Sequence, residues 1–298
     1  MVSDLPEKFV RLMTESHGAK GTLWLAELPA IIGEIEEKWS LKAGKPFENL
    51  SYHFVAPCRL ANGGAAVLKV GFPEENSPVF NEAEMLKLYD GNGAVKFLRR
   101  DEKRLVLLLE KLSPGEHLLR VFPQDAEKAV EIAIEILRKI RRKPPENHNF
   151  VLLENWFAGF AKAEVTNFPK DVLKKARGFY DELSKAENFL IHGDFHHENI
   201  LSAEREPFLA IDPKGVIGQI GYEISVFLNN HVWWLSKDAN LREKLDNAVT
   251  KFSEAFELDR QTLREWAYAQ AVLSAWWTFE ENGKNWQTDL ALADVWEV

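Results

Sequence analysis

The stretch from His192 to Asn199 constrains this chain more than any other. It packs three histidines, two acids and an asparagine into eight positions. Apolar residues bracket it on both sides, with Phe189 to Ile191 before it and Ile200 to Leu201 after it. A loop so rich in polar side chains, fixed at both ends to a hydrophobic core, is typical of an active site on a rigid scaffold.

The spacing within this stretch, His-x-Asp-x-x-x-x-Asn, is that of a kinase catalytic loop, with His192, Asp194 and Asn199 at the named positions. In such a loop a carboxylate orients the attacking hydroxyl and accepts its proton, which is the role we expect for Asp194. An amide oxygen a few residues later holds a metal ion, which we expect of Asn199. His192 is expected to brace the loop.

A second short signal follows the loop, where the apolar strand predicted for residues 208–211 ends at Asp212. A carboxylate at the end of a strand is positioned by the sheet, so we expect Asp212 to be the second metal ligand. Magnesium accepts such sparse oxygen ligation and completes it with waters and phosphates. The two signals together predict ATP and Mg²⁺ as cofactors.

Two charged residues in the N-terminal part of the chain fit the same chemistry. Lys69 lies in an otherwise apolar strand predicted for residues 65–70, and Glu82 shares the apolar face of the next helix with Leu86 and Tyr89. We expect the lysine to neutralise nucleotide phosphates and the glutamate to hold the lysine. Plainer interpretations are an edge-strand lysine that reaches water and a solvated helix acid.

No clear Gly-x-Gly-x-x-Gly loop precedes Lys69. The segment 46–51 is the candidate cover for the phosphates. Ser51 and nearby backbone N–H groups would make the contacts.

The hydrophobic periodicity divides the chain into two predicted domains, residues 1–110 and residues 111–298. The first begins with a helical extension over residues 1–40, in which Pro29 is expected to bend or interrupt a helix. Strands and one crossing helix follow, and the breaker residues at 110–115 are interpreted as a hinge. The second domain is mostly helical, with helices predicted at residues 126–142, 150–165 and 170–186. The pattern predicts an α+β fold.

Composition excludes several classes of protein. The net charge of −9 argues against a nucleic-acid-binding protein and is compatible with a cationic small-molecule substrate. The single cysteine, Cys58, excludes an intramolecular disulfide framework. Neither a signal peptide nor an uncharged apolar run of membrane-spanning length is apparent. We therefore expect a soluble, cytoplasmic protein, and a monomer.

At this point the chain resembles the aminoglycoside phosphotransferase superfamily, and more closely its aminoglycoside/hydroxyurea antibiotic resistance kinases, the group of streptomycin 6-kinases. The resemblance covers residues from about 20 to the end. It rests on Leu190-Ile191-His192-Gly193-Asp194 with Asn199, on Ile211-Asp212-Pro213-Lys214-Gly215, and on further stretches that include 24–29, 66–69, 81–84, 90–95, 107–110 and 269–277. The Asp-Pro-Lys-Gly sequence is specific to this branch, whereas His-Gly-Asp is shared across the superfamily.

The resemblance implies a bilobal, protein-kinase-like fold that binds ATP at the hinge and transfers the γ-phosphoryl group to a small-molecule hydroxyl. It implies Asp194 as catalytic base, Asn199 and Asp212 as magnesium ligands and Lys69 as phosphate contact. The adenine hinge would comprise Leu109, Glu110 and Leu112. Relatives often read Gly-Asp-Pro-Ala-Tyr-Asp where this chain has Gly218 to Glu223, a departure that leaves the ATP-binding residues unchanged and concerns the choice of substrate.

Other functions stay open on the sequence alone. The acceptor could be an unrelated sugar or metabolite hydroxyl. His192, Asp194, His196 and His197 could form a zinc hydrolase cluster, although such a site would need further ligands from distant segments. A non-catalytic nucleotide-binding pseudokinase is a third alternative. Glu280 and Glu281 are candidate amine contacts for a cationic substrate, with solvated surface acids as the plainer interpretation.

Overall fold

The computed structural model describes residues 5–74 and 78–296. Its internal contacts divide the chain into two compact units, residues 1–113 (unit 1) and residues 114–298 (unit 2). The division falls inside the segment of breaker residues at 110–115. Each unit carries its own core and its own share of the residues singled out above.

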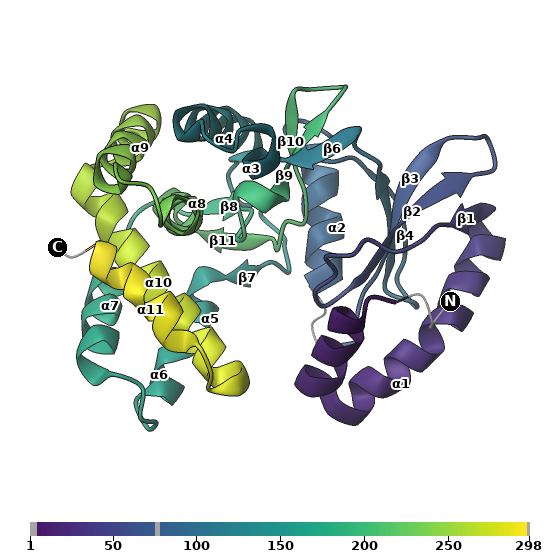
Figure 1. The fold of residues 1–298 in the computed structure, drawn as a ribbon, viewed down its shortest axis with the longest axis horizontal. Coiled ribbons are helices and arrows are strands. Elements are labelled where there is room, and N and C mark those ends of the chain that lie inside the picture. The colour runs from purple at the N-terminus through teal and green to yellow at the C-terminus, as the bar shows by residue number, and fades with distance from the viewer. Residues whose placement is uncertain (1–4, 75–77, 297–298) are drawn as a thin grey trace. The chain divides into compact units, whose positions relative to one another are not determined.

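Unit 1 is built on a five-stranded antiparallel sheet in the order β1-β2-β3-β5-β4 (Figure 1). A tight turn joins β2 to β3, and Gly63 takes the left-handed conformation (φ 82°) that this turn requires. The predicted strand at residues 65–70 is confirmed. The sequence also predicts a hairpin with strands at residues 94–98 and 104–109, and the structure places these strands at residues 97–101 and 106–110. The strands are β1 (Leu41–Ala43), β2 (Phe54–Leu60), β3 (Ala65–Val70), β4 (Phe97–Asp101) and β5 (Val106–Glu110).

Two helices complete unit 1. The long helix α1 (Glu7–Trp39) is interrupted at Gly18, where the backbone turns to φ 54° and ψ −128°. The helix runs through Pro29 without a break, so the predicted interruption there is wrong. The kink lies at Gly18 instead, because glycine tolerates the positive φ that it needs. The helix α2 (Pro78–Tyr89) crosses the sheet against β4 and β5. The Ser-Pro sequence at 77–78 predicts Ser77 as the N-cap of this helix, but Ser77 lies outside the described residues.

The core of unit 1 joins α1 to the sheet. Apolar side chains of α1, among them Trp24, Leu28 and Ile32, form one buried cluster with Ala66 and Leu68 of β3. The alternation along β3 therefore fixes which of its side chains face this core.

Unit 2 contains two small three-stranded sheets. Their orders are β10-β9-β6 and β7-β11-β8. The first contains β6 (Pro114–His117), β9 (Ile200–Ala203) and β10 (Phe208–Ala210), and the second β7 (Val151–Leu152), β8 (Phe189–Ile191) and β11 (Val216–Gly218). These short sheets hold both polar loops, because β8 and β9 flank residues 192–199, and β10 and β11 flank residues 211–215.

Helices make up most of the rest of unit 2 (Figure 1). The helix α8 lies at its centre, is buried along nearly its whole length, and contacts α9 and α10. The helices are α3 (Leu118–Val121), α4 (Ala126–Ile140), α5 (Leu153–Phe157), α6 (Phe160–Ala163), α7 (Lys170–Leu183), α8 (Ile220–Leu235), α9 (Leu241–Phe256), α10 (Arg260–Asn282) and α11 (Trp286–Val295), with the 3₁₀ turn η2 (His197–Asn199).

One local prediction for unit 2 is wrong. The helix expected at residues 150–165 is instead β7 followed by the two short helices α5 and α6. Val151 and Leu152 extend to pair in parallel with β11, which takes their backbone groups out of a helix. The breaker residues Pro114 and Gly115 begin β6, which pairs with β9 across a register irregularity. Across the described residues, no helix combines the length and apolar character needed to cross a membrane.

Candidate active site

The two polar loops of unit 2 are joined by three backbone-anchored hydrogen bonds. The ring Nε2 of His192 lies 2.8 Å from the carbonyl oxygen of Ile211. The backbone N–H of Lys214 donates to the carbonyl of His192 over 2.8 Å, and that of Ile211 to the carbonyl of Asn199 over 2.9 Å. These bonds bring Asp194, Asn199 and Asp212 together, as the sequence predicts.

His192 is neutral in this arrangement. Complete burial lowers its pKa to about 4, and the charge of Asp194 offsets only part of that effect. A neutral ring that contacts a carbonyl through Nε2 must carry its proton there. Its Nδ1 then accepts the backbone N–H of Asp194, at 3.3 Å. The ring thus holds the second loop with one nitrogen and the Asp194 backbone with the other.

The position between His192 and Asp194 requires a glycine, Gly193, because its surroundings leave no room for a side chain. Its φ is 83°, and an added Cβ would lie 2.8 Å from Cγ2 of Val216 and 3.1 Å from the ring of Trp156. The backbone N–H of Gly193 donates to Oε2 of Glu223, in the first turn of α8, at 2.8 Å. The loop is therefore anchored to the central helix of the unit.

Glu223 is a site residue that the sequence analysis did not assign. Its side chain is fully buried, and burial raises its pKa to about 8, while the N–H of Gly193 acts in the opposite direction. At neutral pH it is a carboxylic acid. The only signal in the sequence is an acid in the first turn of a mostly apolar helix, and that pattern does not reveal its partner.

Asn199 and Asp194 face one another across the loop. The amide Nδ2 of Asn199 donates to the backbone oxygen of Asp194 at 2.9 Å and lies 3.4 Å from its Oδ2. This orientation turns Nδ2 toward the loop and leaves Oδ1 as the amide atom suited to a cation. The carboxylate of Asp194 is about one-third exposed (36%), so a substrate hydroxyl can approach it.

Asp212 adopts a left-handed backbone conformation, with φ 58°. Among residues other than glycine, aspartate and asparagine tolerate this region best, and such conformations cluster at functional sites. The Oδ2 atom of Asp212 lies 2.8 Å from the Nζ of Lys214, whose Nζ is also 3.4 Å from Oδ2 of Asp194. Lys214 belongs to the Asp-Pro-Lys-Gly sequence, but no role was predicted for it.

The donor set fits magnesium better than zinc. Asn199 and Asp212 offer oxygen atoms, and Mg²⁺ is commonly held by one or two protein oxygens together with phosphates and water. Within the described part of the chain, no group of three or more His, Cys, Asp or Glu residues could hold a metal ion. A zinc hydrolase cluster around His196 and His197 therefore has no support.

The buried face of His197 points to a second histidine. Its Nε2 lies 3.0 Å from Nδ1 of His231, and its ring stacks on Phe227 of α8. Burial lowers the pKa of His231 to about 3 and that of His197 well below its ordinary value. The two histidines lie on the buried side of η2, whereas Glu198 lies on its exposed side.

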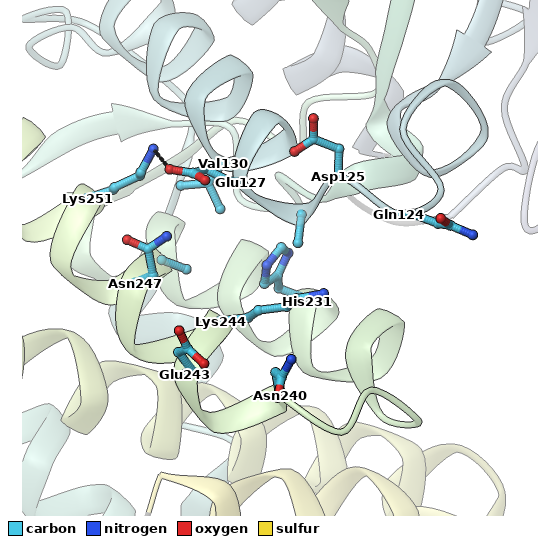
Figure 2. Close-up of a pocket in the computed structure, with 12 residues that line it drawn as sticks. Gln124, Asp125, Glu127, Val130, His231, Asn240, Glu243, Lys244, Asn247 and Lys251 are labelled. Atoms are coloured by element: carbon cyan, nitrogen blue, oxygen red, sulfur yellow. Dashed lines mark ion pairs between the residues drawn. The ribbon is translucent and has the colours of Figure 1, made fainter.

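His231 also lines a cavity of about 340 Å³ between the start of α4, the end of α8 and α9 (Figure 2). An ion pair between Lys251 and Glu127, 2.6 Å long, lies on one side of it, and further charged groups come from Asp125, Glu243 and Lys244. None of Asp194, Asn199 and Asp212 lines this cavity. The contact between His231, which lines the cavity, and His197 connects this cavity to the polar loop.

The remaining predicted nucleotide contacts lie in unit 1. Lys69 of β3 and Glu82 of α2 form an ion pair of 2.6 Å with both side chains buried. Leu109 and Glu110 end β5, and Glu110 accepts the backbone N–H of Lys96 at 3.0 Å. Leu112 is buried two residues later, and Ser51 is exposed in the segment before β2.

The two candidate substrate acids lie at the C-terminal end of α10. Glu280 forms a surface ion pair of 2.9 Å with Lys162 of α6, and Glu281 is exposed. No contact described above connects either acid with the loop of Asp194. Their assignment as amine contacts stays a prediction.

The fold and the joined loops define a phosphotransferase with a protein-kinase-like fold. A solved structure of a choline/ethanolamine kinase family protein from Mesorhizobium loti is similar, with a TM-score of 0.65 at 15% identity over 92% of this chain and 95% of that one. The model of the aminoglycoside/hydroxyurea antibiotic resistance kinase family matches residues 38–283, and the chain belongs to that family.

Two characterised proteins are similar over nearly the whole chain. Streptomycin 6-kinase of Streptomyces griseus is 27% identical and is matched over 93% of this chain and 91% of its own length. Hydroxyurea phosphotransferase of Kitasatospora aureofaciens is 29% identical, over 94% of this chain and 82% of its own. The protein is accordingly a phosphotransferase that acts on a hydroxyl group.

Proposed function

We propose that the protein transfers the γ-phosphoryl group of ATP to a hydroxyl of an aminoglycoside such as streptomycin, or of hydroxyurea, and thereby confers resistance. The observation that carries this proposal is the joined pair of loops that brings Asp194, Asn199 and Asp212 together in a member of this kinase family. The names of the two similar proteins supply the acceptors.

In the proposed reaction, the oxygen of the acceptor hydroxyl attacks the γ-phosphorus while Asp194 accepts the proton of that hydroxyl. Asn199, through Oδ1, and Asp212 would hold Mg²⁺, which when bound neutralises the charge of the phosphates. Lys69, held by Glu82, contacts the phosphates from unit 1. Catalysis is then mainly positioning and charge stabilisation, since phosphoryl transfer needs little covalent participation by the protein.

The nucleotide and acceptor contacts belong to the same proposal. Leu109, Glu110 and Leu112 contact the adenine, and Ser51 covers the phosphates. A net charge of −9 suits a cationic acceptor, for which Glu280 and Glu281 are the candidate amine contacts. The protein works as a cytoplasmic monomer. The alternative acceptor is the hydroxyl of a sugar or metabolite.

The test is phosphate transfer from ATP with Mg²⁺ to a panel that contains streptomycin, other aminoglycosides and hydroxyurea. The wild type should phosphorylate at least one of these. Asp194→Asn should reduce kcat by about 10²- to 10⁴-fold, the usual contribution of a positioned general base. The matched control is Asp181→Asn, at an exposed position of α7, which should leave kcat unchanged. Transfer to none of the acceptors would remove the substrate assignment, and full activity of Asp194→Asn would remove the base.

A further inference from the structure

Lys214 stands between the two carboxylates of the site. Its Nζ is 2.8 Å from Oδ2 of Asp212 and 3.4 Å from Oδ2 of Asp194, and 30% of its side chain is exposed. One ammonium group therefore faces both the proposed base and a proposed metal ligand, and all three side chains are partly exposed.

Backbone contacts hold Lys214 in place on the loop of Asp194. Its N–H donates to the carbonyl of His192, two residues before Asp194, at 2.8 Å. Its Cβ lies 3.4 Å from the point where a side chain on Gly193 would begin. Gly215 follows with φ 67°, which closes the turn. The stem of Lys214 thus packs on the same loop that carries Asp194.

An ammonium at this place has a chemical use. In the proposed reaction the phosphoryl group moves from the phosphate chain, held through Asp212, to the hydroxyl oriented by Asp194. Charge on its three outer oxygens must be stabilised during that movement. A fixed cation aimed at the place where charge develops is an effective form of such stabilisation.

We propose that Lys214 is a catalytic residue that contacts the phosphoryl group during its transfer. This inference rests on the proposed function. In the reaction, a bond forms between the acceptor oxygen and the γ-phosphorus, and the bond from that phosphorus to the β–γ bridging oxygen breaks. The electron pair leaves with ADP and the proton goes to Asp194. Lys214 stays protonated throughout and supplies charge alone.

The first test compares Lys214→Met with the wild type in kcat, in KM for ATP and in the affinity for MgADP. We expect kcat to fall by about 10²- to 10³-fold, the usual cost of one such donor, with KM and MgADP affinity within about threefold of the wild type. Lys174→Met, at an exposed position of α7, is the matched control and should leave kcat unchanged. A loss confined to KM, or a kcat within about threefold of the wild type, would overturn the proposal.

The second test restores the charge chemically. The Lys214→Cys variant should be as slow as Lys214→Met. Aminoethylation of its thiol with bromoethylamine rebuilds an ammonium group of nearly the same length. The chain has a single native cysteine, Cys58, which is buried, so the reaction of the folded protein is directed to position 214. We expect kcat to rise at least about tenfold after modification; no rise, with modification confirmed by mass, contradicts the proposal.

These experiments separate the failure of this inference from failure of the proposed function. If the wild type phosphorylates no acceptor of the panel, the same variants are compared by hydrolysis of ATP, with water as acceptor. A loss in Lys214→Met together with recovery in the aminoethylated variant then still supports Lys214 as a contact of the phosphoryl group. Equal hydrolysis rates in all variants would overturn it.

Discussion

Glu223 shows how one buried side chain can set the conformation of a reactive loop. Its carboxyl group accepts the N–H of Gly193, whose neighbours are His192 and Asp194. A neutral acid accepts this bond through its carbonyl oxygen, which an amide also offers. The negative charge of Glu223 is therefore unnecessary for the anchor at neutral pH.

We predict that Glu223→Gln folds and keeps a kcat within about tenfold of the wild type, whereas Glu223→Ala loses more than about 100-fold because the loop is released. The pKa of Glu223 is raised to about 8 from its ordinary value. The folded state thus holds this proton up to higher pH than the unfolded state, and wild-type stability falls as pH rises toward and through 8.

Glu223→Gln should lack that loss, so urea unfolding at pH 7 and pH 9 should show a smaller difference for the variant than for the wild type. An equal pH dependence in both proteins would refute the buried neutral acid.

At this scale the sequence predicts that Asp194, Asn199 and Asp212 belong to one site, because their spacing reflects the local geometry of two loops. It does not predict the role of Glu223, because the partner is a backbone N–H thirty positions earlier. Lys214 was visible only as part of a signature. Which carboxylates an ammonium group meets depends on how the two loops are joined, and no spacing records that.

The ion pair of Lys69 and Glu82, the proposed phosphate contact, joins the strand β3 to the helix α2. Both side chains are at least nine-tenths buried, with 6% and 3% of their surfaces exposed. Breaking a buried ion pair at one end leaves an uncompensated charge, whereas apolar replacement of both ends is often neutral for stability.

We therefore predict that Glu82→Leu alone lowers the free energy of unfolding by about 3 to 5 kcal/mol, and that the double variant Lys69→Met with Glu82→Leu recovers most of this loss. The double variant should nevertheless be inactive in phosphate transfer, because the phosphate contact is gone. Urea unfolding and the transfer assay measure the two effects separately. A double variant as unstable as the single one would contradict this account of the pair.

Elements with a strong, unbroken pattern were predicted well from the sequence. The strand β3 has the predicted bounds because it is a short apolar run, and the helix α2 lies where Glu82, Leu86 and Tyr89 indicate one helical face. Residues 150–165 were mistaken for a helix, since the pairing of Val151 and Leu152 with β11 is a tertiary event. The kink of α1 at Gly18 was not predicted either, because local propensity indicated Pro29 as the place of an interruption.

At the scale of the whole molecule, unit 2 carries three buried histidines, His192, His197 and His231. Burial lowers the pKa of each below the ordinary value, to about 4 for His192 and about 3 for His231. The unfolded chain binds protons at these positions below pH 6.5, whereas the folded chain does not. Their contribution to stability is therefore complete above pH 6.5 and is lost as the pH falls.

We predict that the double variant His197→Phe with His231→Phe loses less stability than the wild type between pH 7.5 and pH 5. Each neutral histidine costs about 2 kcal/mol over this range, and removal of both members of a hydrogen-bonded pair avoids an unpaired group. Stacking on Phe227 suits an aromatic replacement. The measurement is urea unfolding at both pH values; an unchanged pH dependence would exclude the pair as its source.

The left-handed backbone at Asp212 has a consequence for how this position can vary. Two separate filters act on it, since the conformation admits mainly glycine, asparagine and aspartate, while the proposed ligation demands a carboxylate. Glutamate passes the second filter and fails the first, and asparagine does the reverse. Selection among random codons at position 212 should accordingly enrich asparagine and glycine for folding alone, and converge on aspartate when survival in the presence of the antibiotic is required.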